Sequence, residues 1–259
     1  MDSNMYLESI LNKYAPRSLD SHTPNILLLK ADLQKWASSC FISTLNSGSR
    51  AKGTAISLAS DVDYLISLTS SCNANNGGLK SIYDSLHTFL KGKYNSVRKQ
   101  NVSFRIKFGE LEVDITPARK QSSNTNDHWL YVSKLDTWRQ TNIQKHITDI
   151  SGCGRSNEIK LLKIWRELNQ LDFPSIYLEY LTINILSGKW KDPTKLADNV
   201  WYVLQELSKD TSNPLNCRIV DPANSANILS DLLNLAEKKT IISKAKIATG
   251  KQYWSEIVW

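Results

Sequence analysis

The chain has 259 residues and a formal net charge of +7, with 41% hydrophobic and 22% charged residues. These proportions are ordinary for a globular protein long enough to bury a sizeable core. No apolar run approaches the roughly 18 residues that a membrane-spanning helix needs, so no membrane partner is expected. The excess of Lys and Arg over Asp and Glu favours polyanionic ligands, meaning nucleotides or RNA.

The cysteines and the N-terminus bear on the cellular compartment. Cys40, Cys72, Cys153 and Cys217 are widely scattered and form no C-x-x-C pair. Residues 1–5 lack a basic segment followed by an apolar stretch, which is the mark of an export signal. We therefore expect a cytoplasmic protein whose cysteines are reduced.

Hydrophobic periodicity predicts a mixed first half and a helical second half. The first half has helical spacing over residues 4–14, 24–36 and 79–92, and strand patterns over 40–45, 61–68, 94–100, 102–108 and 111–115. The second half is expected to form helices from Ser156 to Leu168, from about Ser175 up to Gly188, over 194–209 and over 228–248. Ser122 to Asp127 shows no periodicity and is interpreted as a linker. We accordingly expect one domain over residues 1–122 and a second over 123–259.

A short polar stretch between two predicted strands has the character of a phosphate and metal site. Gly48 and Ser49 follow the first strand, and Asp61 and Asp63 open the next after eleven intervening residues. Side chains alternate along a strand with a period of two, so Asp61 and Asp63 project from one side. Two carboxylates on one face are costly unless a cation lies between them. Glycine and serine in a turn offer N–H groups and a hydroxyl to an anion.

This stretch resembles the signature of the polymerase-β-like nucleotidyltransferases. Their pattern of Gly-Gly or Gly-Ser, a spacer of about this length, and Asp-h-Asp-h (h being apolar) is filled by Gly48-Ser49 and Asp61-Val62-Asp63-Tyr64. Further agreement over Lys52–Ile56 and at Ser60 points to the branch of bacterial cGAS/DncV-like enzymes, oligoadenylate synthetases and archaeal-type CCA-adding enzymes. The resemblance implies an α+β fold: a palm built of a mixed β-sheet with flanking helices, then a helical domain, with the active site in the cleft between them.

The family completes its acidic triad with a residue in an Asp-h-x-Pro-Ala context, and Asp114 to Ala118 looks like that segment. Asp61, Asp63 and Asp114 are therefore the expected catalytic residues and metal ligands. Three carboxylates allow two Mg²⁺ (or Mn²⁺) ions to bind at once. Glu112 lies on the same face of its strand, so an assignment shifted by two residues stays open.

Later motifs imply contacts to the nucleotide. Leu161 to Trp165 resembles a helix of this branch whose lysine contacts phosphates, which makes Lys163 the first candidate and Lys160 the second. Pro174-Ser175 resembles a helix start whose serine donates to a triphosphate, while Gly48 and Ser49 would cradle the phosphates. Asp221-Pro222, followed by Asn227, matches a further family segment and is interpreted as architectural. Trp129, Tyr131 and Trp138 are candidates either for stacking on a base or for packing.

The resemblance implies a metal-dependent nucleotidyltransferase that uses NTPs, ATP above all. The preferred function is a cGAS/DncV-like synthase of cyclic or linear oligonucleotide signals in antiphage defence. One alternative is addition of nucleotides to an RNA 3′ end, and another is nucleotidylation of a protein. RNA stays open as an activator or acceptor, and a catalytically silent nucleotide-binding protein is disfavoured by the three acids.

Overall fold

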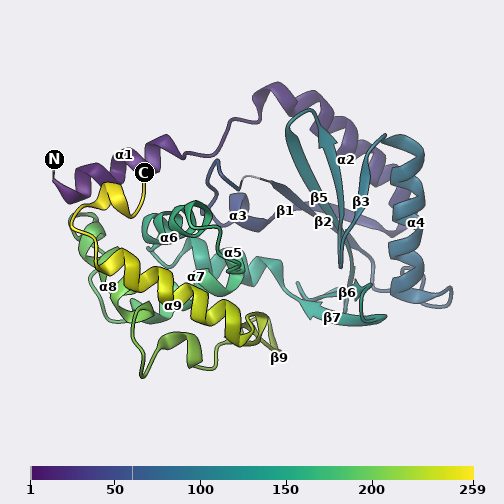
Figure 1. Cartoon of the computed structure of the whole chain (residues 1–259). Helices are drawn as coiled ribbons and strands as arrows, with labels where there is room; N and C mark the ends of the chain where they lie inside the picture. The colour runs from purple at the N-terminus through teal and green to yellow at the C-terminus, as the bar shows by residue number, and fades with distance from the viewer. Residues whose placement is uncertain (1, 60) are drawn as a thin grey trace. The chain divides into compact units, whose positions relative to one another are not determined.

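The computed structural model describes residues 2–59 and 61–259, and these fall into two compact units (Figure 1). The sheet unit consists of residues 18–52 and 60–147, and the helical unit of residues 1–17, 53–59 and 148–259. Both units are thus discontinuous in sequence, whereas the sequence suggested a single boundary after residue 122. Ser60, which belongs to the family-like run, lies outside the described residues.

The sheet unit is built on a seven-stranded mixed sheet. Its main path runs β1-β2-β5-β4-β3, and β6 continues from β5 to β7. β2 and β5 pair in parallel, while the other neighbours are antiparallel. The strands are β1 (Phe41–Ser47), β2 (Val62–Leu68), β3 (Val97–Lys99), β4 (Phe104–Phe108), β5 (Leu111–Lys120), β6 (His128–Val132) and β7 (Thr137–Thr141).

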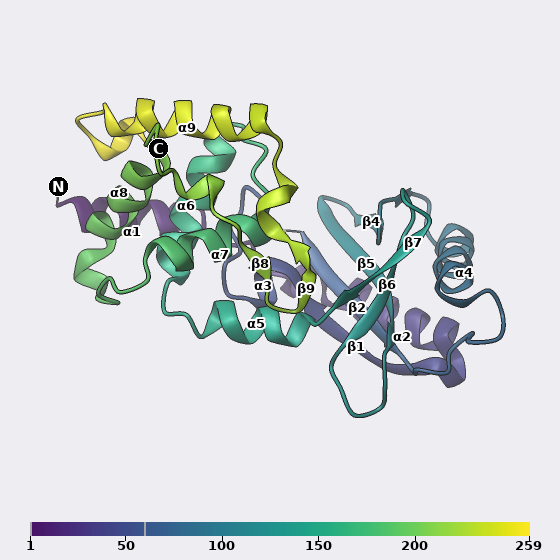
Figure 2. The same cartoon turned by 90° about the horizontal axis from the view of Figure 1, so that it is seen from below.

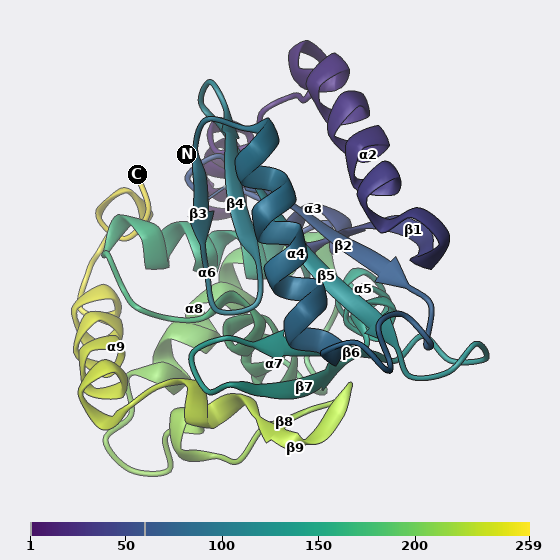
Figure 3. The same ribbon diagram turned by 90° about the vertical axis from the view of Figure 1, so that its right-hand side faces the viewer.

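Two long helices cover one face of this sheet, as the views along and across it show (Figures 1 and 3). They are α2 (Thr23–Ala37) and α4 (Gly78–Lys93), and the single-turn α3 (Gly48–Ala51) follows β1. The alternating side chains Tyr64 and Ile66 of β2, and Val113 of β5, are buried against these helices. The period of two consequently sends the intervening polar side chains of both strands to the opposite face.

The helical unit packs its helices around a second core. Its helices are α1 (Ser3–Lys13), α6 (Ser156–Leu168), α7 (Ser175–Ile185), α8 (Leu196–Leu207) and α9 (Leu235–Thr249), and its hairpin consists of β8 (Val220–Asp221) and β9 (Asn224–Ile228). The last residues of α5 (Ile143–Ser151), from 148 onward, also belong to this unit. α8 and α9 lie side by side (Figure 2). Trp165 and Tyr177 are among its largest fully buried side chains. Ile56, from the spacer of the nucleotidyltransferase motif, belongs to the same core.

Two expectations from the sequence are wrong. The last helix was expected from residue 228, but Ile228 ends β9 and the helix begins at Leu235, where Asn234 caps it by accepting from the Ala236 and Glu237 amides at 2.8 and 3.0 Å. Before it, Asp221 Oδ1 accepts from the Ala223 amide at 2.9 Å and its Oδ2 accepts from Asn227 at 2.8 Å, which closes the β8–β9 hairpin. Cys40 and Cys72 are not reduced thiols but a disulfide with a Cα–Cα distance of 5.4 Å. No helix formed by the described residues is sufficiently long and apolar to cross a membrane.

Candidate active site

Three acidic residues meet on the sheet face opposite α2 and α4. The parallel register of β2 and β5 places Asp63 directly beside Asp114. Asp61 precedes β2 by one residue, so its side chain falls on the same side as that of Asp63. Glu112 lies on the same face but pairs in register with Lys107, whose ammonium is 2.7 Å from its carboxylate. The neighbour of Asp63 is thus Asp114 and not Glu112.

A partly buried arginine links these acids. Arg105 of β4 lies opposite Asp114 and donates to it through both Nε and Nη2, each at 2.7 Å. Nη2 is also 2.5 Å from Asp61, and Nη1 donates to Glu112. Burial raises the pKa of Asp61, and the charge of Arg105 opposes that effect. The same carboxylates raise the pKa of the guanidinium, chiefly through its hydrogen bonds to Asp114.

The electrostatics of Asp63 indicate a site that favours a cation. Its pKa is raised from 3.8 to about 6, first by burial and then by the negative charges of Asp114 and Asp61. Crowded carboxylates are relieved by a bound cation, and a donor set made only of carboxylate oxygens suits Mg²⁺ or Mn²⁺. Over residues 2–59 and 61–259, no three His, Cys, Asp or Glu side chains are already arranged to hold a metal. The Arg105 guanidinium lies among the acids, and the charges of Lys52 and Arg105 both lower the pKa of Asp63.

Gly48 is required by the position of Asp63. It follows β1 as the first residue of α3 and has φ of +65°, a left-handed conformation that favours glycine. A Cβ at this position would lie 1.7 Å from Oδ2 of Asp63, far inside van der Waals contact. The glycine therefore lets the backbone approach the carboxylate. Ser49 follows in α3 and is partly exposed.

The remaining predicted site residues, Lys160, Lys163 and Ser175, belong to the helical unit. Lys160 and Ser175 are partly exposed, whereas Lys163 is 2% exposed. The structure thus groups Gly48, Ser49 and the three acids within the sheet unit, and it groups the two lysines and the serine on α6 and α7.

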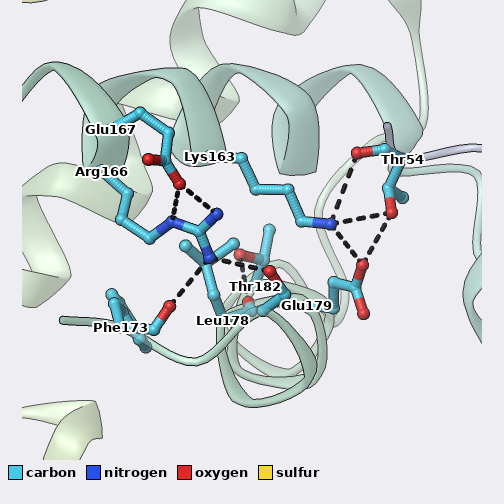
Figure 4. A network of polar contacts seen from close by, with 9 residues as sticks. Thr54, Lys163, Arg166, Glu167, Phe173, Leu178, Glu179 and Thr182 are labelled. Carbon is cyan, nitrogen blue, oxygen red and sulfur yellow. Dashed lines mark hydrogen bonds and ion pairs between the residues drawn. The ribbon is translucent and has the colours of Figure 1, made fainter. Parts of the chain in front are cut away.

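The Lys163 ammonium is saturated by contacts inside the helical unit (Figure 4). It donates to Glu179 Oε1 at 2.6 Å, to the Thr54 hydroxyl at 2.9 Å and to the Thr54 carbonyl at 3.3 Å. An ammonium has three N–H donors, so this set uses all of them. Thr54 also donates to Glu179 at 2.6 Å, and Thr54 and Glu179 are both fully buried. Lys163 therefore anchors residues 53–59, which form part of the spacer between the Gly-Ser turn and Asp61.

The Ser175 hydroxyl contacts a buried arginine. It is the first residue of α7, and its hydroxyl accepts from Arg166 Nη1 at 2.8 Å. The same nitrogen donates to the Phe173 carbonyl at 2.9 Å, and Glu167 pairs with the other side of the guanidinium (Figure 4). Arg166 is 7% exposed, so a buried cation lies directly beside Ser175.

Sequence reasoning missed Arg105, Thr54 and Arg166. Arg105 had a signal: the turn at Gly109-Glu110 sets Phe108 opposite Leu111, and counting back along both strands pairs residue 105 with 114. The contact of Thr54 with Lys163 had no signal in the sequence, because 109 residues separate the two.

A mixed sheet that gathers three acids, joined to a helical unit, defines a nucleotidyltransferase. Residues 1–153 match the family described as Second Messenger Oligonucleotide or Dinucleotide Synthetase domain (SMODS), and the chain belongs to that family. It is thus a second-messenger synthetase of the cGAS/DncV-like branch, which confirms the resemblance seen in the sequence. No curated protein matches the chain.

Solved structures of this branch share the fold. CdnC of E. coli MS115-1, in its complex with HORMA-deltaN, is 19% identical with a TM-score of 0.73, and the match covers 96% of this chain and 90% of that one. CdnG of Bradyrhizobium diazoefficiens, solved with GTP, is 10% identical with a TM-score of 0.73 over 98% and 95% of the two chains. CdnE of Elizabethkingia meningoseptica, solved with GTP and Apcpp, is 13% identical with a TM-score of 0.65 over 93% and 97%.

Proposed function

We propose that the chain transfers a nucleotidyl group from an NTP to a hydroxyl acceptor and that Asp61, Asp63 and Asp114 bind the divalent metal for this reaction. The observation that carries the proposal is the register of β2 and β5, which sets Asp63 beside Asp114 with Asp61 two residues away. Mg²⁺ or Mn²⁺, when bound there, would neutralise charge on the transferring phosphoryl group and lower the pKa of the attacking hydroxyl.

The protein residues have separable roles in this proposal. The three acids hold the metal, and the raised pKa of Asp63 reflects its burial and then the negative charge of Asp114 and Asp61, which a metal would balance. Gly48 leaves room for the Asp63 carboxylate, and Gly48 and Ser49 bind the phosphates. Arg105 occupies Asp61 and Asp114 through its hydrogen bonds in the metal-free protein, so a metal would compete with its guanidinium for them.

The residues of the helical unit divide into contacts and anchors. Lys160 and Ser175 remain the proposed phosphate contacts, because both side chains are partly exposed. Lys163 was the first candidate from the sequence, but its three N–H donors are taken by Thr54 and Glu179. A phosphate contact from Lys163 would require the ammonium to leave a buried ion pair. We therefore assign it to holding the spacer and leave the phosphates to Lys160 and Ser175.

The proposed product is a cyclic or linear oligonucleotide signal that acts in antiphage defence, and ATP is the expected substrate. Support comes from membership of a family of oligonucleotide and dinucleotide synthetases. Among the similar structures, CdnC of E. coli MS115-1 was solved with ATP and CdnG with GTP.

The test is to incubate the purified chain with each labelled NTP and Mg²⁺, with and without RNA, and to separate the products after phosphatase treatment. A phosphatase-resistant small product formed without RNA is expected, and it should disappear in Asp63→Asn. The matched control is Asp198→Asn, an exposed acid of the helical unit whose side chain is 71% exposed, and it should retain full activity. Label found only on RNA or only on protein would overturn the signal synthase in favour of that acceptor.

A further inference from the structure

A pocket in the sheet unit contains the aromatic residues that the proposed function leaves unused. It has a volume of about 340 Å³, within the range of small-molecule sites. Its walls come from the first turn of α4 and from β5, β6 and β7, and they include Lys80, Arg119, Trp129, Tyr131 and Trp138.

Strand register explains why these side chains converge. Arg119 of β5 pairs with Trp129 of β6, and Tyr131 of β6 pairs with Trp138 of β7. Trp129 and Tyr131 are two residues apart on one strand, so all four side chains share one face of the sheet. Trp138 is 64% exposed, which leaves an indole surface open at this pocket.

The pocket offers one cation without an acidic partner. Lys80 is paired with Asp136 at 3.1 Å, and Asp136 also accepts from the Tyr131 hydroxyl, so these charges are balanced locally. Arg119 donates only to the Cys72 carbonyl, at 3.4 Å, and no carboxylate among residues 2–59 and 61–259 forms an ion pair with it. The first turn of α4 adds the partial positive charge of a helix start.

This pocket is separate from the three acids. Arg119 is five residues beyond Asp114 on β5, which is about 16 Å along an extended strand. An odd separation also places the two side chains on opposite faces of the sheet. Binding in this pocket would need none of the proposed metal ligands.

We propose that this pocket binds a nucleoside monophosphate, with its base on the Trp138 indole and its phosphate on Arg119. Indole faces stack on any base, and a guanidinium binds phosphate through paired N–H groups. An apolar ligand would leave the Arg119 charge unsatisfied, and a metal ion would find no carboxylate beyond Asp136, which is already paired. The volume accommodates a ligand about the size of one nucleotide.

The test is calorimetric titration of AMP into the full chain in the presence of EDTA, which removes metal-dependent binding at the acids. Wild type is expected to bind one AMP per chain. Trp138→Ala and Arg119→Gln should each weaken binding about tenfold or more, the loss expected for a stacked base or a charge-assisted phosphate contact. Asp63→Asn should bind as wild type, which separates this pocket from the proposed active site.

The matched control is Trp190→Ala, because Trp190 is another exposed tryptophan, 83% exposed, in the helical unit. It should leave AMP affinity unchanged, and thermal melts would confirm that each variant is folded. Absence of binding at millimolar AMP, or wild-type affinity in both pocket variants, would overturn the proposal. Equal affinity for inorganic phosphate would remove the role of the base, and much tighter binding of a short single-stranded RNA would replace the mononucleotide with a strand.

Discussion

Replacing Lys163 by Met tests whether the buried contact with Glu179 anchors the motif spacer. The two charges lie 2.6 Å apart with side-chain exposures of 2% and 0%. Loss of the ammonium removes the cation that lies 2.6 Å from the buried Glu179 carboxylate, while the Thr54 hydroxyl still donates to that carboxylate. Removing one partner of a buried pair typically costs about 3–5 kcal/mol. For a chain of this size that corresponds to a fall of roughly 6–20 °C in melting temperature.

The assay is thermal unfolding of wild type, Lys163→Met, Glu179→Leu and the double variant. The double variant should recover much of the loss, since replacing both charges by apolar groups removes the uncompensated charge. Lys195→Met is the control, because its pair with Asp198 is exposed at 54% and 71%, and such pairs contribute little. Hydrogen exchange should quicken at residues 53–59 in Lys163→Met. A melting temperature within a degree of wild type, with unchanged exchange there, would refute the anchoring role.

Three further predictions concern the acids. Gly48→Ala should lower the rate of nucleotidyl transfer about 100-fold, because the new methyl group would displace Asp63. Gly53→Ala is the control: Gly53 has a similar φ of +71°, no described atom lies within 4 Å of its added Cβ, and the rate should be unchanged. Equal rates in the two variants would contradict the steric account. Because the Asp63 pKa in the folded state, about 6, exceeds the unfolded 3.8, the folded protein binds more protons between these values. The free energy of unfolding of metal-free protein in EDTA should therefore fall as pH rises from 4 to 7. In urea melts of Asp63→Asn this fall should be smaller than in wild type, by on the order of 1–3 kcal/mol. Arg105→Gln should lower the Mg²⁺ concentration that gives half-maximal rate roughly fivefold, because a metal no longer competes with the guanidinium for Asp61 and Asp114. An increase in that concentration would show that Arg105 supports metal binding instead.

The acidic face could be predicted because it follows from local periodicity. Residues 111–115 alternate apolar and polar side chains, and the Asp-x-Asp pattern has the same period. Asp61 and Asp63 therefore share one face of their strand, Glu112 and Asp114 share one face of theirs, and the apolar side chains lie on the opposite face. The parallel pairing that makes Asp63 and Asp114 neighbours is a long-range choice. The family resemblance implied only that Asp114 completes the acidic triad, and neither strand alone fixes the pairing.

Other features depend on partners that are distant in sequence. Lys163 has a motif that suggests a phosphate contact, yet its surroundings are decided by Thr54 and Glu179. Cys40 and Cys72 give no spacing signal, but one precedes β1 and the other follows β2, and the antiparallel pairing of these strands brings them together. The last helix begins at Leu235 and not at Ile228, because Ile228 pairs with Val220 in the β8–β9 hairpin and Asn234 caps the helix.

The most direct test of the proposed active site compares Asp114→Asn with Glu112→Gln in a pyrophosphate-release assay with NTP and Mg²⁺. Both acids lie on the same face of β5 and both contact Arg105, but only Asp114 is in register with Asp63. The proposed site predicts a loss of three orders of magnitude or more (about 4 kcal/mol) for Asp114→Asn and a rate within about threefold of wild type for Glu112→Gln. Full activity in Asp114→Asn, or an equal loss in both variants, would contradict the assignment of the metal ligands.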